Sequence, residues 1–442
     1  MARPGTGQGE SAAAPADGSL NMTSTALRRG IFYGWWIVVA GFVVQMFTSG
    51  VGTNSVGVYL VVLQEEFGWS KAFISGAFAL AMFQAAALAP FQGRLVDRFG
   101  PRAVVRTGIV IMAVGLMTLG LIYSQWQLYV SSLLIGLGFT LAFDVALQTA
   151  VVNWFRKRRG TAMGLMMAGA GAGGVLVPGV AMAVQVFDWR RAVLFAGIIL
   201  LVVGVAAAQF IKRSPEEYGL SPDGETNRNN HDTEGATTND HGDVEFTVRQ
   251  ALRTPAFWFL ALGQALVMFG VTAVGMHLVP HASESLGLSL TAAGSLMTVL
   301  TVCIVAGHVG GGFVADKVDK RKFIVAYTIV QTGVLALLVF GTSLWVLVLF
   351  AVAQGLIVGA RAPLNFALRA DYFGRKAYGT IWGVSLLVSN LGNMAGMIVT
   401  GYLADRSGSY QPAFIVLMAM TGLAVILLAM VRRPARPAAI AS

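Results

Sequence analysis

Twelve stretches of predominantly apolar residues run along the chain, each bounded by polar or charged residues. A helix needs about 20 such residues to cross the hydrocarbon core of a bilayer, which is about 30 Å thick. The mean hydropathy of +0.68 and the low charged fraction of 12% agree with a chain surrounded by lipid. The predicted spans are residues 32–60, 70–92, 102–123, 126–152, 159–184, 189–211, 255–281, 289–314, 322–342, 344–370, 377–402 and 409–431.

A short phrase occurs twice, about half the chain apart. Residues 93–98 read GRLVDR and residues 312–317 read GFVADK, each at the end of an apolar stretch. A second pair, WFRK at 154–157 and YFGR at 372–375, keeps nearly the same separation. Duplicated units of this kind are common in secondary transporters. The predicted fold class is therefore an all-α integral membrane protein of twelve transmembrane helices in two pseudo-symmetric six-helix bundles.

The predicted domain boundaries follow from the composition of the intervening segments. Residues 1–29 are rich in Gly, Ala, Pro and Ser, and the segment before the seventh span is polar, so both are predicted to be flexible. The predicted parts are a disordered N-terminal tail at 1–29, bundles at 30–211 and 255–431, a cytoplasmic linker at 212–254 and a C-terminal tail at 432–442.

The distribution of Lys and Arg predicts the orientation, because basic short loops stay on the cytoplasmic side. With both termini in the cytoplasm, the outer loops hold only Lys71, Arg190, Arg191 and Arg406. The net charge of +10 is then explained by topology and lipid contact, without a nucleic acid partner. A single cysteine and no signal-peptide pattern favour a bacterial inner (plasma) membrane.

Two ionisable residues lie deep in predicted spans, where a charge costs about 2.5 to 3.5 kcal/mol and usually faces a cavity or a partner. Asp144 and Arg361 lie about 13 Å from the inner ends of their spans at 1.5 Å per residue. They hold nearly equivalent positions in the two halves, so we expect the opposite charges to face each other. Gln148 and Asn365 follow four residues later on the same helix faces.

Arg361 is the predicted anchor for an anion, because its planar guanidinium forms two parallel bonds with a carboxylate. Asp144 is predicted to contact the substrate or to carry a proton. The alternatives are a structural ion pair between Asp144 and Arg361, or charges that line the space between the halves without touching a ligand. Gln45 and Asn393 are candidates to complete the lining, although either is equally suited to bonding helices together.

Several motifs carry a family resemblance. GRLVDRFGPR at 93–102 resembles the signature loop of the major facilitator superfamily. YGWW at 33–36, NWFRKRRGTAMGLMMAGAGAGG at 153–174, RSPEEYGLSPDG at 213–224 and GYLADRSGSY at 401–410 resemble its monocarboxylate and oxalate:formate branch. The resemblance implies two six-helix bundles around a central cavity lined mainly by the first and fourth helices of each half, with alternating access. It does not specify the substrate.

The repeated phrase is also the predicted gate. A carboxylate at a helix end can accept from backbone donors or an arginine across the cytoplasmic mouth, and glycine lets a neighbouring helix come close. The other interpretation is that these charges only set the topology. The predicted gate residues are Gly93, Asp97, Arg98, Arg102, Asp316 and Lys317.

His277 and His308 are predicted proton-coupling residues alongside Asp144, because histidine titrates near neutral pH. His308 stands where relatives of this branch generally carry arginine, and Ile304 replaces an aspartate of the mammalian-type members. Either Arg361 has taken over anion binding with His308 as a helper, or the substrate is not a simple monocarboxylate. A packed polar role for His308 is the third interpretation.

The sequence thus predicts a secondary active transporter and not an enzyme. The leading substrate is a small organic anion, a monocarboxylate of the lactate or pyruvate type, carried with protons by alternating access. No cofactor and no metal site are predicted, and a monomer should suffice. The alternatives are an anion exchanger of the oxalate:formate type, a proton-coupled transporter of drugs or cations, and a non-transporting membrane sensor.

Overall fold

The computed structural model describes residues 32–224, 245–285, 287–288, 290–341 and 343–435. These residues form helices joined by short connections, and no strand occurs among them. The predicted N-terminal tail, the middle of the predicted linker and the last seven residues of the predicted C-terminal tail lie outside the described residues.

The first half of the chain contains six membrane-crossing segments, three of which are built from successive helices. They are α2 (Gly34–Thr48) with η1 (Ser49–Thr53) and α3 (Val56–Phe67); α4 (Lys71–Phe99); α5 (Pro101–Leu119); α6 (Gln125–Phe143) with α7 (Val145–Trp154); α8 (Arg159–Ala172) with η2 (Gly173–Leu176) and α9 (Val177–Phe187); and α10 (Trp189–Ala208).

The second half repeats this arrangement after a connecting segment. The connection contains η3 (Glu216–Tyr218), η4 (Pro222–Gly224) and α11 (Val248–Leu252). The six crossings of the second half are α12 (Pro255–Pro280) with η6 (His281–Ser285), α13 (Leu290–Ala315), α14 (Lys320–Phe340), α15 (Leu344–Phe373), α16 (Tyr378–Ser407) and α17 (Gln411–Met430).

The twelve predicted spans correspond to these segments, which confirms the predicted fold class. Eleven described segments are long and apolar enough to cross a membrane. The twelfth, α4, carries a shorter apolar stretch at Gly76–Ala85, and its last turns hold charged residues. Those turns are part of the repeated phrase, so the phrase is helical and α4 runs to Phe99 instead of ending near residue 92.

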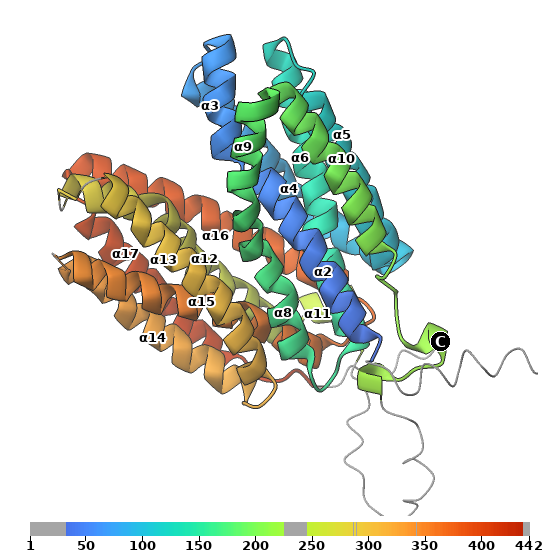
Figure 1. The fold of residues 1–442 in the computed structure, drawn as a ribbon. Coiled ribbons are helices and arrows are strands. Elements are labelled where there is room, and N and C mark those ends of the chain that lie inside the picture. The colour runs from blue at the N-terminus through green and yellow to red at the C-terminus, as the bar shows by residue number, and fades with distance from the viewer. Residues whose placement is uncertain (1–31, 225–244, 286, 289, 342, 436–442) are drawn as a thin grey trace, which may run out of the picture.

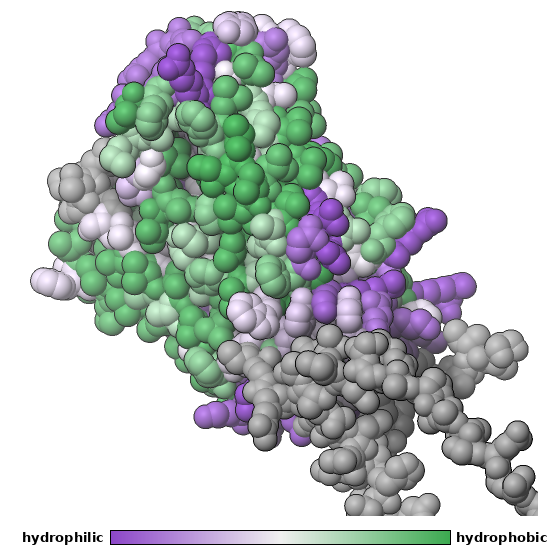
Figure 2. Space-filling view, turned by 45° about the vertical axis from the view of Figure 1, so that its right-hand side comes forward, coloured by the Kyte–Doolittle hydropathy of each residue, from purple (hydrophilic) through white to green (hydrophobic). Residues whose placement is uncertain are grey.

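The outside of the bundles is apolar at its middle. Figure 2 shows hydrophobic side chains over the middle of one face, with hydrophilic ones gathered toward its two ends. Large apolar side chains such as Phe83, Val202 and Ile398 are more than half exposed. Water would solvate such a surface poorly, whereas lipid tails match it, so the chain is a multi-pass membrane protein.

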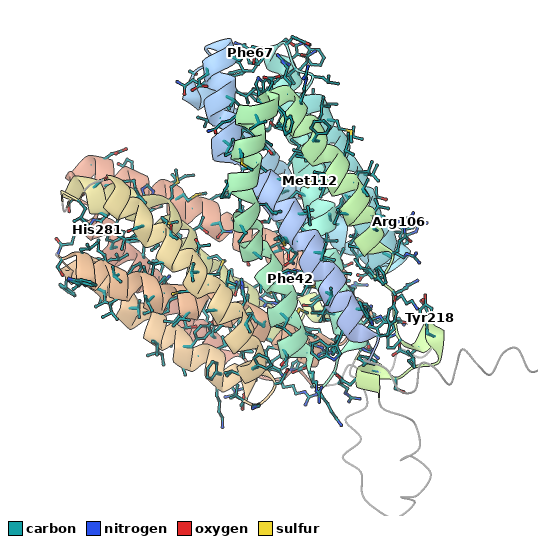
Figure 3. The ribbon with its side chains drawn as sticks, in the orientation of Figure 1. Phe42, Phe67, Arg106, Met112, Tyr218 and His281 are labelled. Carbon is teal, nitrogen blue, oxygen red and sulfur yellow. The ribbon has the colours of Figure 1, made fainter. Side chains whose placement is uncertain are left out.

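The helices form two bundles, α2 to α10 and α12 to α17 (Figure 1). The most extensive contacts between them are made by two helix pairs, α4 with α16 and α8 with α13. The bundles meet at the end that carries the loops 155–158 and 374–377, here called the linker end, and diverge toward the opposite, distal end. Tyr218 lies at the linker end, whereas Phe67 and His281 lie at the distal ends of the two bundles (Figure 3).

Glycines bring the two crossing pairs into backbone contact. A Cβ atom on Gly164 of α8 would lie 2.1 Å from the carbonyl oxygen of His308 in α13. A Cβ atom on Gly93 of α4 would lie 2.2 Å from the carbonyl oxygen of Gly379 in α16. No side chain can occupy either position unless the backbones move apart, so these glycines permit the closed contact at the linker end.

We expect Gly164→Ala to separate the bundles at the linker end, because its added methyl would meet backbone rather than a flexible side chain. Spin labels on the exposed Arg98→Cys and Lys376→Cys positions, with Cys303→Ser, should report a longer distance across α4 and α16. The matched control is Gly179→Ala, which would meet no heavy atom within 4 Å. A distance unchanged in Gly164→Ala would contradict this role.

Candidate functional site

Asp97 joins the first bundle to the start of α16 in the second. Its carboxylate accepts hydrogen bonds from the backbone N–H of Gly379 at 3.1 Å and of Thr380 at 2.9 Å. The Thr380 hydroxyl donates to the same carboxylate at 2.5 Å. A carboxylate suits this place because the first turn of a helix has unpaired N–H groups and a partial positive charge. We call this set of contacts the first latch.

Asp316 makes the equivalent contact in the opposite direction. It accepts from the N–H groups of Gly160 at 2.7 Å and Thr161 at 2.9 Å, in the first turn of α8. The Thr161 hydroxyl donates to it at 2.6 Å. This second latch is related to the first by the repeat, because each copy of the phrase caps a helix of the other half.

The other predicted gate residues differ in position. Gly93 contacts the other half, as described above. Arg98 lies over the ring of Phe99 with 5.3 Å to the ring centroid, and Arg102 bonds to Gln209 of its own half. Lys317 is exposed. The structure therefore places Gly93 and the two aspartates between the bundles, and the three basic residues outside that contact.

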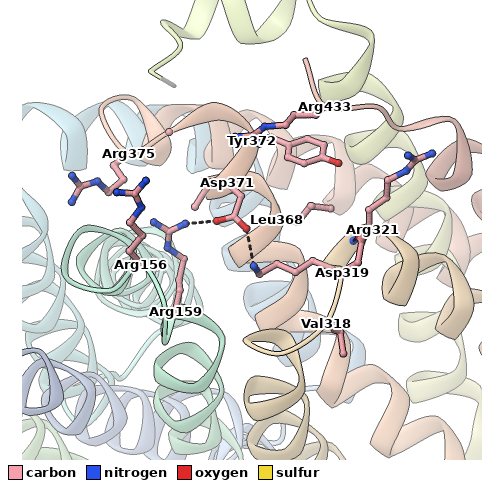
Figure 4. A pocket seen from close by; sticks show the side chains of 13 residues that line it. Arg156, Arg159, Val318, Asp319, Arg321, Leu368, Asp371, Tyr372, Arg375 and Arg433 are labelled. Carbon is pink, nitrogen blue, oxygen red and sulfur yellow. Dashed lines mark hydrogen bonds and ion pairs between the residues drawn. The ribbon is translucent and has the colours of Figure 1, made fainter. Parts of the chain in front are cut away.

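An ion-pair bridge, not anticipated from the sequence, also joins the bundles at the linker end (Figure 4). The Asp371 carboxylate in α15 accepts from Arg159 of α8 and from Lys320 of α14, both at 2.8 Å. These residues border a cavity of about 350 Å³ whose lining also includes Arg321 and Arg375. The repeated WFRK and YFGR motifs lie at the loops beside this bridge, and their repetition was the feature of the sequence that could have indicated it.

Arg361 is buried in α15, with 2% of its surface exposed. Its Nη2 donates to Oε1 of Gln264 in α12 at 2.7 Å. Its Nε and Nη1 atoms are buried without a hydrogen-bond partner, and no acidic side chain within the described ranges pairs with it. Asn365, one turn later, donates to the Arg361 carbonyl oxygen at 3.1 Å. The site thus holds a positive charge that lacks a protein counter-charge.

Arg369 is a second buried arginine on the same face of α15, and the sequence analysis missed it. It is 1% exposed and donates to Oδ1 of Asn365 at 3.3 Å and to the Ser385 hydroxyl at 3.1 Å. Its guanidinium lies over the ring of Trp382 with 4.9 Å to the centroid. The four-residue spacing of Arg361, Asn365 and Arg369 places all three on one helix face and could have indicated a second buried arginine. Arg369 lies near the end of the helix, however, where an arginine is expected to be exposed.

Asp144 stands at the break between α6 and α7, with φ −98° and ψ −92°. Gln148 donates to its carboxylate through the side-chain amide. The indole of Trp382, from the other bundle, lies near the same carboxylate, but its N–H group is buried without a hydrogen-bond partner among the described residues. Gln45 lies 1% exposed beside this break and donates to the Phe143 carbonyl oxygen at 3.4 Å.

Asp144 and Arg361 do not pair directly. No ion pair joins them in the parts of the chain that the structure describes. Trp382 of the second bundle lies near Asp144, and its ring is covered by the guanidinium of Arg369. Arg369 in turn donates to the Asn365 side chain, which donates to the Arg361 carbonyl oxygen. The two predicted charges are therefore separated by these side chains and do not face each other as a pair.

The remaining predicted residues lie on other helix contacts. His308 is buried at 9% exposure, with its Nδ1 unpartnered. His277 places Nε2 3.3 Å from the Met397 carbonyl oxygen, between α12 and α16. Asn393 accepts from the Thr272 hydroxyl at 2.6 Å in the same helix pair. No hydrogen bond between described residues connects these three side chains to Arg361.

Groups of three or more His, Cys, Asp or Glu placed to hold a metal ion do not occur among the described residues. The site described above consists of two buried arginines and one partly buried carboxylate. A guanidinium offers charge-assisted hydrogen bonds to carboxylates, so the arginines are chemically suited to an anion.

Comparison with known proteins agrees with the fold. The model of the Major Facilitator Superfamily matches residues 39–280 and 260–442. MFS transporter asaE of Aspergillus flavus is 27% identical over 404 residues, covering 89% of this chain and 86% of that protein. Monocarboxylate transporter 11 of Mus musculus is 28% identical over 395 residues, covering 87% and 84%.

A solved structure shows the same architecture at low sequence identity. The E. coli fucose:proton symporter FucP superposes with a TM-score of 0.68 at 16% identity, over 90% of this chain and all of that one. This likeness concerns the fold, whereas the family match and the curated relatives span most of the sequence. The chain belongs to the major facilitator superfamily, a family of membrane transporters and not of enzymes, and to the branch that resembles the monocarboxylate transporters.

Proposed function

We propose that this transporter moves a small organic anion, a monocarboxylate of the lactate or pyruvate type, together with protons. The observation that carries the proposal is the buried guanidinium of Arg361, whose Nε and Nη1 atoms lack a partner. A buried charge without a counter-charge is costly, and an anionic substrate would supply that counter-charge. Arg369 adds a second positive charge on the same helix face.

Proton coupling is supported by the chemistry of the first bundle. Asp144 is a partly buried carboxylate that the described basic residues do not neutralise, with an amide and an indole as its neighbours. A proton on Asp144 would remove its charge when the anion is bound and so avoid repulsion between two carboxylates. His308, buried next to Gly359 of α15, and His277 are the secondary candidates for carrying that proton.

Several contacts suggest which residues touch the substrate. Gln148 and Gln45 each keep a buried, unpartnered side-chain oxygen near Asp144, and Asn365 joins Arg361 to Arg369. The unpartnered amide oxygens can accept a hydrogen bond from a hydroxyl group of a small acid, whereas the side-chain amide N–H groups can donate to its carboxylate or keto oxygens. Asn393 has its own partner in Thr272 and would play a supporting part.

Alternating access would use the two latches as the inner gate. In this structure both latches are formed and the bundles diverge away from them (Figure 1). The concentration of Lys and Arg in the loops at the linker end supports a cytoplasmic location for that end and for both termini. A bacterial inner membrane is the proposed location, and a monomer contains all the groups invoked.

A thermal-shift screen of organic acids tests the substrate class. A bound acid should raise the melting temperature by mass action. At an acid concentration of 100 times the Kd, the folded state gains about 2.7 kcal/mol of stability. Lactate, pyruvate, oxalate and formate should be compared with organic cations at equal ionic strength. Stabilisation by cations alone would indicate a drug or cation transporter, and stabilisation by none of these compounds would favour a non-transporting sensor.

Uptake into proteoliposomes separates symport from exchange. If protons move with the acid, a pH gradient with the outside more acidic than the vesicle interior should accelerate uptake of the labelled acid several-fold. A protonophore should abolish that gain. An exchanger of the oxalate:formate type would instead require a second anion inside the vesicle and would ignore the pH gradient. Empty liposomes control for passive entry of the protonated acid.

A further inference from the structure

The two ends of the linker are held by the bundles. The sequence analysis predicted a flexible segment between the halves, but residues 212–224 and 245–254 make specific contacts at the linker end. The Trp154 indole donates to the Lys212 carbonyl oxygen at 3.1 Å, and Asn153 donates to that of Arg213 at 2.9 Å. The Lys212 ammonium lies 3.7 Å from the centroid of the Tyr218 ring.

One linker carboxylate binds the loop that precedes α8. Asp223 accepts from the backbone N–H of Arg156 at 2.8 Å and of Lys157 at 2.6 Å. Asp223 has φ +60°, a left-handed conformation that residues other than glycine adopt uncommonly. Such a conformation persists where surrounding contacts impose it, and here it accompanies a carboxylate bound to successive N–H groups.

A second linker carboxylate makes the equivalent contact with the loop that precedes α16. Glu245 accepts from the backbone N–H of Arg375 at 3.2 Å and of Lys376 at 2.7 Å. The loops 155–158 and 374–377 are the corresponding parts of the two halves. The linker therefore places one carboxylate on each, with the same pattern of successive backbone donors.

These loops lead directly into the two latches. The amides that bind Asp316 belong to Gly160 and Thr161, only a few residues after the loop held by Asp223. The amides that bind Asp97 belong to Gly379 and Thr380, directly after the loop held by Glu245. A carboxylate that fixes either loop also fixes the direction in which the following helix presents its first N–H groups.

Arg375 connects this arrangement across the bundles. Its backbone N–H is held by Glu245, while its Nη1 donates to the Asn153 carbonyl oxygen at 2.8 Å and contacts Glu216 Oε1 at 3.2 Å. Asn153 lies in the last turn of α7 in the first bundle, and Glu216 lies in the linker. Separation of the bundles at the linker end must break the contact between Arg375 and Asn153.

We propose that the linker is a working part of the inner gate. Asp223 and Glu245 are positioning residues that hold the loops 155–158 and 374–377, and they thereby stabilise the conformation that is closed at the linker end. This role depends on alternating access by the family fold and is independent of the transported substrate.

Hydrogen exchange measured by mass spectrometry on the full chain in lipid nanodiscs tests this role without a substrate. In the double variant Asp223→Ala and Glu245→Ala, peptides that contain the amides of 160–161 and 379–380 should exchange at least tenfold faster than in the parent. Glu217→Ala is the matched control, because this exposed linker acid has only a 4.0 Å contact with Arg213. It should leave both latches unchanged.

The result that overturns the proposal is faster exchange confined to 156–157 and 375–376, with both latches protected as in the parent. Amides of α5, away from the linker, serve as the internal reference for folding. If the α5 amides also exchange rapidly in the double alanine variant, that variant is misfolded and the double variant Asp223→Asn and Glu245→Gln is measured in its place. Faster exchange at the two latches then supports the proposal, and faster exchange confined to the two loops contradicts it. Failure of this test leaves the anion proposal untouched, because no anion is present.

Discussion

Arg361→Ala is expected to abolish transport of the organic acid, lowering uptake by at least about 100-fold. Loss of one partner from a buried charge pair costs about 3 to 5 kcal/mol, which corresponds to roughly 200-fold or more in affinity. The same variant should melt at an equal or higher temperature without ligand, because it removes a buried charge that has no acidic partner in the described structure. Uptake and ligand-dependent thermal shift, measured on one preparation, check both parts.

Two variants control this result. Arg191→Ala removes an exposed arginine and should leave uptake and thermal shift as in the parent. Arg361→Lys keeps the positive charge but lacks the planar fork, so it should retain a small part of the binding. Full uptake in Arg361→Ala would show that this residue does not bind the anion and would make Arg369 the next candidate.

Asp97→Asn and Asp316→Asn together are expected to shift the protein away from the conformation closed at the linker end. Each aspartate accepts three hydrogen bonds from the opposite bundle. Hydrogen bonds to a charged group are worth about 1.5 to 3 kcal/mol, so each latch should change the ratio of the two states by roughly 10 to 100-fold. Transport should fall at least about tenfold, while the amount of protein in the membrane stays unchanged.

Each single variant should be measured at the latch that it does not alter. Spin labels at Arg158→Cys and Lys317→Cys report the second latch in Asp97→Asn, and labels at Arg98→Cys and Lys376→Cys report the first latch in Asp316→Asn. The matched control is Asp319→Asn. Asp319 also caps a helix, through Arg321 N–H at 3.1 Å and Lys322 N–H at 3.2 Å, but entirely within one bundle. Parent-like distances and uptake in both latch variants would show that the aspartates only set topology.

The helices could be predicted from the sequence because a membrane span depends only on a local run of apolar residues. An apolar stretch of about 20 residues must become a helix in lipid, whatever the rest of the chain does. The repeated phrase likewise predicted a set of gate residues, of which Gly93, Asp97 and Asp316 lie at the contact between the bundles. It did not reveal that Asp97 and Asp316 bind backbone N–H groups of the opposite half, because backbone donors look alike in every sequence.

The candidate site could be predicted only in part from the sequence. Asp144 and Arg361 were found because charged residues in apolar stretches stand out. Arg369 was missed because a residue about one turn from a helix end has no local sign of burial. Trp382, which lies between Arg369 and Asp144, is one of many aromatic residues in the chain, and only its position between the bundles distinguishes it.

The sequence by itself determined that this protein crosses a membrane twelve times in two related halves, because apolar length and internal repetition are properties of the chain alone. The tertiary structure decided how the halves meet: which backbone amides the latch aspartates cap, which buried arginine lacks a counter-charge, and where the linker carboxylates Asp223 and Glu245 attach. These contacts join residues that are far apart in the sequence, and their energies depend on distance and burial, which arise only when the bundles pack.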